Sequence, residues 1–165
     1  MPILESLVTA LEPWSTMYGD STVLAVGLTY AHLGAMMVGG GLAIAADRTV
    51  LKAGMVTDVE ARRALASAVG DVHRPVVVAL VISLVSGGLQ LAADLEALAG
   101  NRIMWIKIGL LAALAVNGLL MLRDERGLRS SPEATKWLSA LRLRSTLSAV
   151  LWMAIVLAGV GLMQG

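Results

Sequence analysis

The stretch TVLAVGLTYAHLGAMMVGGGLAIAA, residues 22–46, contains no Asp, Glu, Lys or Arg and has one histidine, His32. A helix of about 20 mostly apolar residues spans the hydrocarbon core of a bilayer. The stretch reaches that length and therefore predicts a transmembrane helix. Glu5 and Glu12 stand where a cleavable signal peptide would have a basic segment, so we expect this helix to be retained.

Three further stretches are long and apolar enough to cross a membrane. They are residues 75–93, 103–122 and 146–163. Of the 165 residues, 57% are hydrophobic and 15% are charged, whereas about 25% are charged in soluble domains. The sequence therefore predicts an all-α membrane protein, a four-transmembrane-helix bundle that forms a single membrane domain over residues 1–165.

Composition excludes several kinds of site. Cysteine is absent, so the chain has no disulfides and no thiolate metal ligands. The formal net charge is +1, and the basic residues do not form a single stripe, so we expect no binding to nucleic acid.

Basic residues are concentrated in two loops, and cytoplasmic loops of membrane proteins carry the excess of Lys and Arg. The first loop contains Arg48, Lys52, Arg62, Arg63 and Arg74, and the third contains Arg123, Arg126, Arg129, Lys136, Arg142 and Arg144. The segment before the first span has no basic residue, and the second loop has only Arg102. We therefore expect a multi-pass protein of a bacterial-type inner (plasma) membrane, with both termini on the outer face.

Two segments outside the spans show helical patterns. Residues 3–14 repeat apolar side chains at helical spacing and end near Pro13, which predicts a short interfacial helix on the outer face. Residues 57–72 begin with Thr57 and Glu60 in a capping-box pattern, followed by helix-forming residues. They predict a separate cytoplasmic helix in the first loop.

His32 lies about 15 Å below the outer end of the first span, close to the middle of the bilayer. A polar or ionisable side chain at this depth is costly, and it commonly faces the interior of the bundle or a cavity. A neutral imidazole there is suited to a haem iron, to copper or to proton relay. The alternative is a hydrogen bond that holds two helices together.

Polar side chains in the second span share one helical face. Ser83, Ser86, Gln90 and Asp94 follow at spacings of three and four residues, and Gly87 lies beside them. We expect this face to point into the bundle, where it either packs against another helix or approaches a flat ligand.

Lys107 lies about one turn below the outer end of the third span, close to Arg102 along the chain. Extension of the side chain toward the interface is one explanation. The other is an anchor for an acidic group, such as a haem propionate or the carboxylate of Asp94.

Methionines offer two kinds of metal ligand. Met36 follows His32 by one turn, and a histidine with a thioether suits Cu(I). The two cannot be opposite axial ligands of one haem, because they leave the same side of one helix. Met153, in the fourth span at a similar depth, is the candidate for a second haem ligand, with a five-coordinate iron as the alternative.

The order of these landmarks resembles the membrane family that includes HemJ-type protoporphyrinogen oxidases and CopD-type copper-resistance proteins. The likeness covers the first three spans. The matching residues are His32, Gly34, the run Gly39 to Gly41, Asp47, Arg48, Pro75, Gly87, Gly88, Trp105 and Lys107. The resemblance implies haem b bound through His32 in HemJ-like members, or copper handling in CopD-like ones, with Lys107 as the lysine near the outer end of the third span.

Three hypotheses follow. The first is a haem b protein, possessing oxidoreductase or electron-transfer activity, with His32 on the iron, Lys107 or Arg102 near the propionates and Gln90 beside the cofactor. It would exchange electrons with quinol or a redox partner subunit. The second is a copper protein using His32 and Met36, and the third is a structural subunit without cofactor. Small residues on the first and third spans also leave room for a homo-oligomer in the lipid bilayer.

Overall fold

The computed structural model describes residues 2–53, 58–130 and 134–162. The described part of the chain is helical, with short connections and no strand. The helices are α1 (Pro2–Asp20), α2 (Thr22–Lys52), α3 (Val59–Ala93), α4 (Leu95–Ala99), α5 (Arg102–Ser130) and α6 (Ala134–Leu162).

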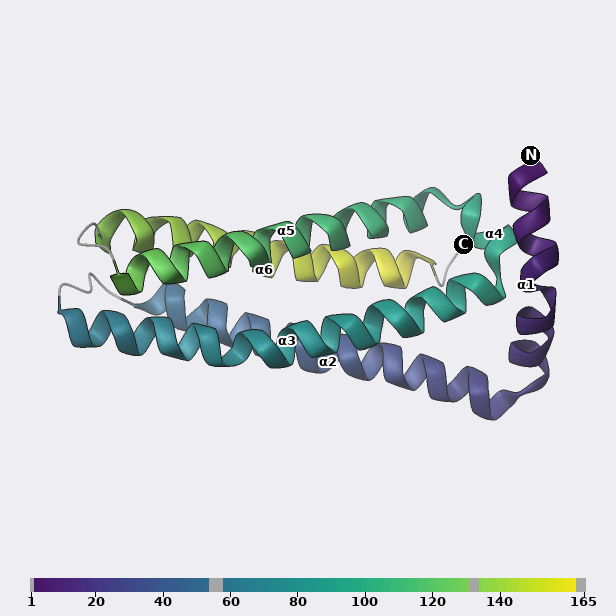
Figure 1. Cartoon of the computed structure of the whole chain (residues 1–165), viewed down its shortest axis with the longest axis horizontal. Helices are drawn as coiled ribbons and strands as arrows, with labels where there is room; N and C mark the ends of the chain where they lie inside the picture. Colours follow the sequence, from purple (N-terminus) through teal and green to yellow (C-terminus); the bar gives the residue numbers. More distant parts are fainter. Residues whose placement is uncertain (1, 54–57, 131–133, 163–165) are drawn as a thin grey trace.

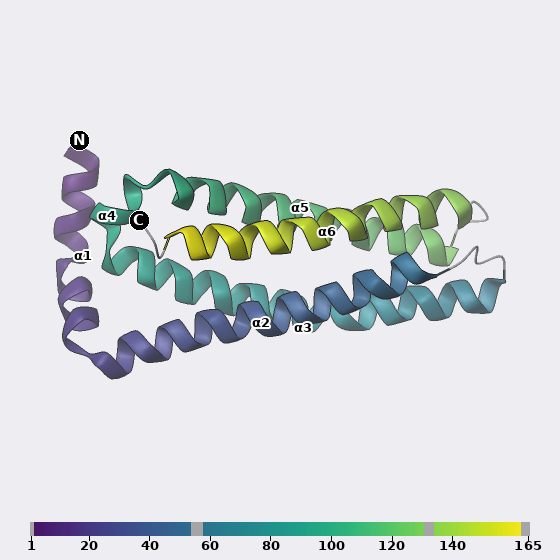
Figure 2. The same cartoon turned by 180° about the vertical axis from the view of Figure 1, so that it is seen from behind.

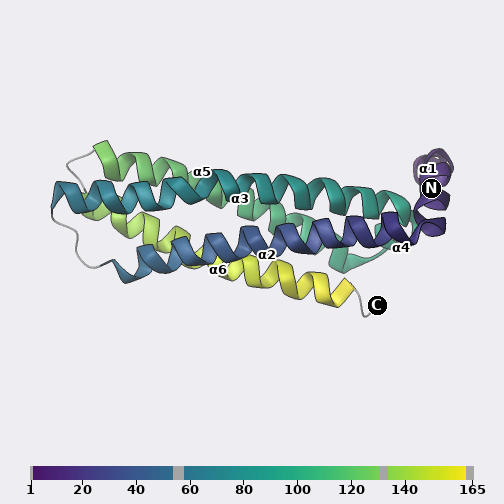
Figure 3. The same cartoon turned by 90° about the horizontal axis from the view of Figure 1, so that it is seen from below.

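The four long helices α2, α3, α5 and α6 run side by side as one bundle (Figures 1 and 2). Helix α1 lies across one end of this bundle, together with the short α4 and the end of α6 (Figure 3). We call this the α1 end. The other is the loop end, where α2 and α5 end and α3 and α6 begin. Helix α2 pairs mainly with α3, and α5 pairs mainly with α6.

All four long helices are apolar and long enough to cross a membrane. Many large apolar side chains face outward, among them Val23 at 85% exposure, Tyr30 at 79% and Leu157 at 72%. A soluble domain would expose such a surface to water over its whole length, whereas lipid tails solvate it at no cost. The predicted fold class, an all-α bundle of four membrane-spanning helices, is therefore confirmed.

The helices are longer than the apolar stretches, and the excess lies at the loop end. Helix α3 has 35 residues, a length of about 52 Å against about 30 Å for the hydrocarbon core. We call the part beyond the apolar stretches the loop-end extension, and it comprises residues 47–52 of α2, 59–74 of α3, 123–130 of α5 and 134–145 of α6. The bundle therefore continues outside the membrane.

This continuation corrects the expected separate helix in the first loop. Residues 59–72 are helical, but they belong to α3, which passes through Pro75 without a break. Pro75 was expected to begin the second span. A proline inside a helix removes one backbone hydrogen bond, but helix α3 continues through it. The N-cap is Asp58, whose carboxylate accepts from Ala61 N at 3.0 Å; Thr57 lies outside the described residues.

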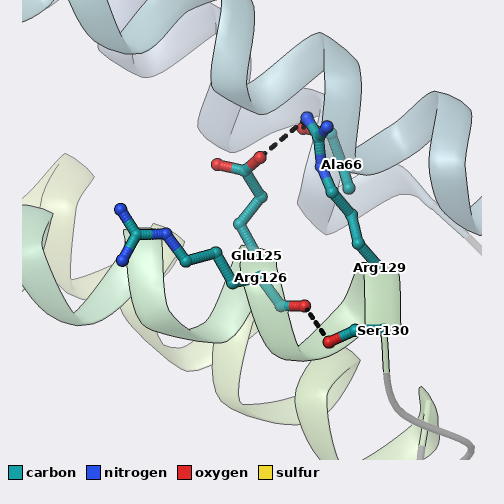
Figure 4. A network of polar contacts seen from close by, with 5 residues as sticks. All are labelled: Ala66, Glu125, Arg126, Arg129 and Ser130. Atoms are coloured by element: carbon teal, nitrogen blue, oxygen red, sulfur yellow. Dashed lines mark hydrogen bonds and ion pairs between the residues drawn. The ribbon is translucent and has the colours of Figure 1, made fainter.

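An apolar core fills the loop-end extension. It consists of Val50, Leu65, Ala66, Val69, Leu128, Leu138 and Leu141. Arg129 closes one side of it: its Nη2 lies 2.8 Å from Glu125 Oε1 and donates to the carbonyl of Ala66 at 3.1 Å (Figure 4). Arg142 donates to the carbonyl of Ala53 and ties α6 to the end of α2. These contacts join all four helices.

A second core lies within the membrane part and is built on close backbone approach. Leu114, Leu151, Trp152 and Ile155 form it. A Cβ atom added to Gly39 would lie 2.9 Å from Ala79 Cβ, and one added to Gly40 would lie 3.1 Å from Trp152 Cε3. Small residues on α2 therefore allow α3 and α6 to pack against its backbone, as is common where helices associate in lipid.

Helix α1 is attached to the end of α3 by side-chain hydrogen bonds. Trp14 Nε1 donates to the carbonyl of Leu89 at 2.9 Å, and Ser15 Oγ donates to that of Ala93 at 2.7 Å. The expected helix is present, but it does not stop at Pro13 and instead continues to Asp20. It crosses the bundle end (Figure 1), as a helix at an interface would.

Candidate cofactor site around His32

His32 faces helix α3 rather than the surface of the bundle. Its Nδ1 lies 2.8 Å from the carbonyl oxygen of Ser83, and the hydroxyls of Ser83 and Ser86 lie 3.4 and 3.3 Å from the same nitrogen. Ser83 and Ser86 are buried, and the imidazole is half-buried. The expectation that the ring looks inward is therefore confirmed.

Gly87 allows this contact. A Cβ atom at Gly87 would lie 2.8 Å from His32 Cε1 and 3.1 Å from its Nδ1, but 3.8 Å from its Nε2. Any larger residue at this position would displace the ring. The imidazole thus rests on bare backbone of α3, with Nε2 the nitrogen farther from that helix.

The hydrogen bond to Ser83 fixes the chemical state of the ring. A backbone carbonyl only accepts hydrogen bonds, so Nδ1 carries the hydrogen and donates. Nε2 of the neutral ring then has a lone pair. A donor bond from one nitrogen to a carbonyl, with the other nitrogen free, is the arrangement commonly found in metal-binding histidines.

The polar face of α3 continues toward the α1 end. Gln90 Nε2 donates to the carbonyl of Leu28 at 3.4 Å and to that of Ser86 at 3.2 Å, so this side chain bridges α2 and α3. Three of the four residues predicted on this face point inward or between helices. Asp94 does not, because it is exposed and forms the C-cap of α3.

Lys107 approaches the same interior from helix α5. Its ammonium lies 3.7 Å from the position of a Cβ added to Gly159 of α6, and its positive charge acts through space on the His32 ring. Within the described residues no carboxylate lies at ion-pair distance from Lys107, so the expected contact with Asp94 is not formed. Arg102 is exposed at the first position of α5.

The two candidate methionines differ in the direction they face. Met153 is 63% exposed on the outer surface of the bundle, so the structure turns the expected second haem ligand away from the interior. Met36 is half-buried and packs against the core around Trp152. Met37, its neighbour, is 75% exposed.

Few side chains are buried on the α1 side of His32. His32, Ser83, Leu114 and Ile155 mark one level on α2, α3, α5 and α6. Between this level and the α1 end, two of the described residues of these helices are buried, Ser86 and Ala93. The apolar core of the membrane part therefore ends at the level of His32. Between this level and α1, the two helix pairs face each other through half-buried and polar side chains.

A second buried polar group, where the membrane part meets the loop-end extension, was not recognised from the sequence. Asp47 is 2% exposed, and the hydroxyls of Ser145 and Ser148 lie beside its carboxylate. Asn117 is also 2% exposed and donates to the carbonyl of Arg144 at 3.0 Å, which joins α5 to α6. The signal was the pair of serines at a spacing of three residues in α6, which share a face with Leu141, Trp152 and Ile155 of the core.

Within the ranges that the structure describes, no three His, Asp or Glu side chains gather where they would share a metal ion. No known protein family, curated protein or solved structure matches the chain. The site must therefore be interpreted from its own geometry, and one histidine with a free nitrogen is its main feature.

Proposed function

We propose that the chain is an integral membrane protein that binds haem b in the half of the bundle near α1, with His32 as the axial ligand. The observation that carries the proposal is the bond between His32 Nδ1 and the Ser83 carbonyl, which leaves Nε2 with a lone pair. Haem iron needs only one such ligand from the protein in a five-coordinate state.

The surroundings of His32 support a planar, partly acidic cofactor. The interior on the α1 side of His32 has few buried side chains that a cofactor would have to displace. Lys107 is half-buried there with its charge directed inward, and Arg102 lies about one turn farther out. Both are suited to haem propionates, which take charge-assisted hydrogen bonds. The order of landmarks shared with HemJ-type and CopD-type proteins agrees with this proposal.

The proposed activity is electron transfer with a quinol or a redox partner subunit, as a membrane oxidoreductase. Because Met153 faces outward, the sixth position of the iron is left to water, to a substrate or to another subunit. The excess of Lys and Arg in the two loops supports a loop end in the cytoplasm of a bacterial-type inner membrane. The haem would then lie in the outer half.

The test is a visible absorption spectrum of the protein purified in mild detergent from haem-replete cells. The wild type is expected to show a Soret band that His32→Ala abolishes. His73→Ala is the matched control, because His73 is the only other histidine and lies far from His32 toward the loop end. A colourless wild type, or copper bound without haem in elemental analysis, would refute the proposal.

A further inference from the structure

A cavity lies away from His32, between helices α3 and α5. Its volume is about 370 Å³, and α2 and α6 form its floor. Its walls are mostly Val and Leu side chains, with Trp152 providing an aromatic surface. This volume is within the range of small-molecule sites, about 300 to 1,000 Å³.

The cavity has a polar end and an apolar end. Asp47, His73, Asn117, Glu125 and Ser148 line it toward the loop end. Val76, Leu80, Leu84 and Leu111 line it toward the middle of the bundle. Leu84 follows Ser83, the residue that holds His32, so the cavity extends from the loop-end extension to the level of the cofactor site.

Two buried oxygen atoms in the lining have no hydrogen-bond partner in the described part of the chain. They are Asn117 Oδ1 and the Oδ2 atom of Asp47, a carboxylate that also has the hydroxyls of Ser145 and Ser148 beside it; both side chains are 2% exposed. An unsatisfied polar atom in a low-dielectric interior is costly. Both atoms are hydrogen-bond acceptors, so the ligand that satisfies them must carry donors.

The rim of the cavity reaches the outer surface of the bundle. Val81 and Leu119, one on each side, line it and are 54% and 67% exposed. In a membrane these side chains contact lipid. A ligand with a long apolar tail can therefore enter from the bilayer and leave its tail there.

We infer that this cavity binds a membrane-soluble quinol, with its hydroxyl groups donating to Asp47 and Asn117 and its ring against Trp152. A quinol combines two donors, one aromatic ring and an apolar tail, which are the features that the lining requires. A phosphate group fits poorly at this end of the cavity, because it is an anionic acceptor and would face the Asp47 carboxylate. The lining calls for an amphiphile that carries hydrogen-bond donors. That this amphiphile is a quinol rests on the proposed function.

Gly118 offers a variant that fills the cavity without disturbing the helix packing. It lines the cavity, and a Cβ atom added there meets nothing within 4 Å. Gly118→Leu should therefore occupy the ligand space and leave the fold intact. Gly109→Leu is the matched control, because Gly109 is on the same helix, has the same free space and lies outside the cavity.

The experiment measures binding of a short-chain alkyl benzoquinol, kept reduced, to the protein in phosphatidylcholine nanodiscs by calorimetry, with empty nanodiscs as the reference. Wild type and Gly109→Leu are expected to bind saturably. Gly118→Leu should weaken binding by more than about tenfold, and Asp47→Asn by about tenfold, the usual loss for a hydrogen bond to a charged group. Circular dichroism and size-exclusion profiles verify that each variant is folded.

Heat no greater than that of empty nanodiscs would overturn the inference, and so would equal binding by wild type and Gly118→Leu. The outcome is separate from that of the haem test. Saturable quinol binding by a protein without a Soret band would refute the proposed haem function and support quinol binding in the cavity. A Soret band without quinol binding would support the haem function and overturn the inference about the cavity.

Discussion

In the loop-end extension the four helices meet through Val50, Leu65, Leu128, Leu138 and Leu141. In the membrane part Gly39 and Gly40 bring the backbone of α2 close to Ala79 and Trp152, beside a core that also contains Leu114, Leu151 and Ile155. The extension is surrounded by water, so burying leucine there is driven by the hydrophobic effect. Within lipid no such drive exists between helices, because the tails are as apolar as leucine. Close packing of small residues takes its place.

The comparison also explains where a cofactor can bind. Both cores lie between the loop end and the level of His32, and few side chains are buried beyond that level. Binding sites commonly occupy regions of low local stability that a rigid part supports. We therefore expect substitutions in the extension to change stability most and substitutions near His32 to change cofactor binding most.

The largest expected effect is on the extension. Leu141→Ala removes a side chain with 0% exposure at the centre of the leucine cluster. Such truncations cost about 2 to 5 kcal/mol of unfolding free energy. Unfolding in mixed detergent and SDS micelles, followed by circular dichroism, measures it. Leu143→Ala is the control on the same helix, since Leu143 is 65% exposed; equal losses in both variants would contradict a water-driven core.

The next effect concerns the membrane part. Gly39→Ala places a methyl group 2.9 Å from Ala79 Cβ, which has no rotatable bond with which to move away. Helices α2 and α3 must separate slightly, at a cost of about 1 to 3 kcal/mol. Gly41→Ala is the control two positions away, because nothing lies within 4 Å of an added Cβ. The same unfolding assay should find it neutral or slightly stabilising, since alanine favours helix.

A smaller change in stability is expected at Gly87, with a larger change in haem binding. Gly87→Ala pushes the imidazole away from α3, because the added Cβ would lie 2.8 Å from His32 Cε1. Losing the bond to Ser83 should cost about 1 kcal/mol and lower the haem content of the purified protein. Gly88→Ala, with free space at its Cβ, should keep the full Soret absorbance. Equal haem content in both variants would argue against His32 as the ligand.

The sequence predicted the spans well because apolar length is a local property that the bilayer selects directly. It also identified the polar face of α3, since Ser83, Ser86 and Gln90 recur at helical spacing. It failed where helices continue without an apolar signal. Residues 59–72 and 134–145 are amphipathic and polar, so nothing local distinguishes a separate loop helix from the extension of a span.

The sequence could not predict the partners across helices. Met153 and His32 have similar depths, but which way a residue faces depends on the rotation of each helix, and α6 turns Trp152 inward and Met153 outward. Asp47 was assigned only to the inner end of the first span. Its burial beside Ser145 and Ser148 depends on the α2–α6 contact, and no periodicity within either helix indicates that contact.

The smallest effect is expected for Gln90, and it tests whether this part of the polar face of α3 only joins two helices or also contacts the haem. Gln90→Leu removes the hydrogen bonds to Leu28 and Ser86, and such bonds between helices in membranes contribute about 0.6 kcal/mol. Stability should therefore fall only slightly in the unfolding assay. If Gln90 only joins α2 and α3, the Soret band and its position stay unchanged. A shifted or weakened band at nearly unchanged stability would instead place Gln90 against the haem, so the spectrum and the unfolding curve must be measured on the same preparation.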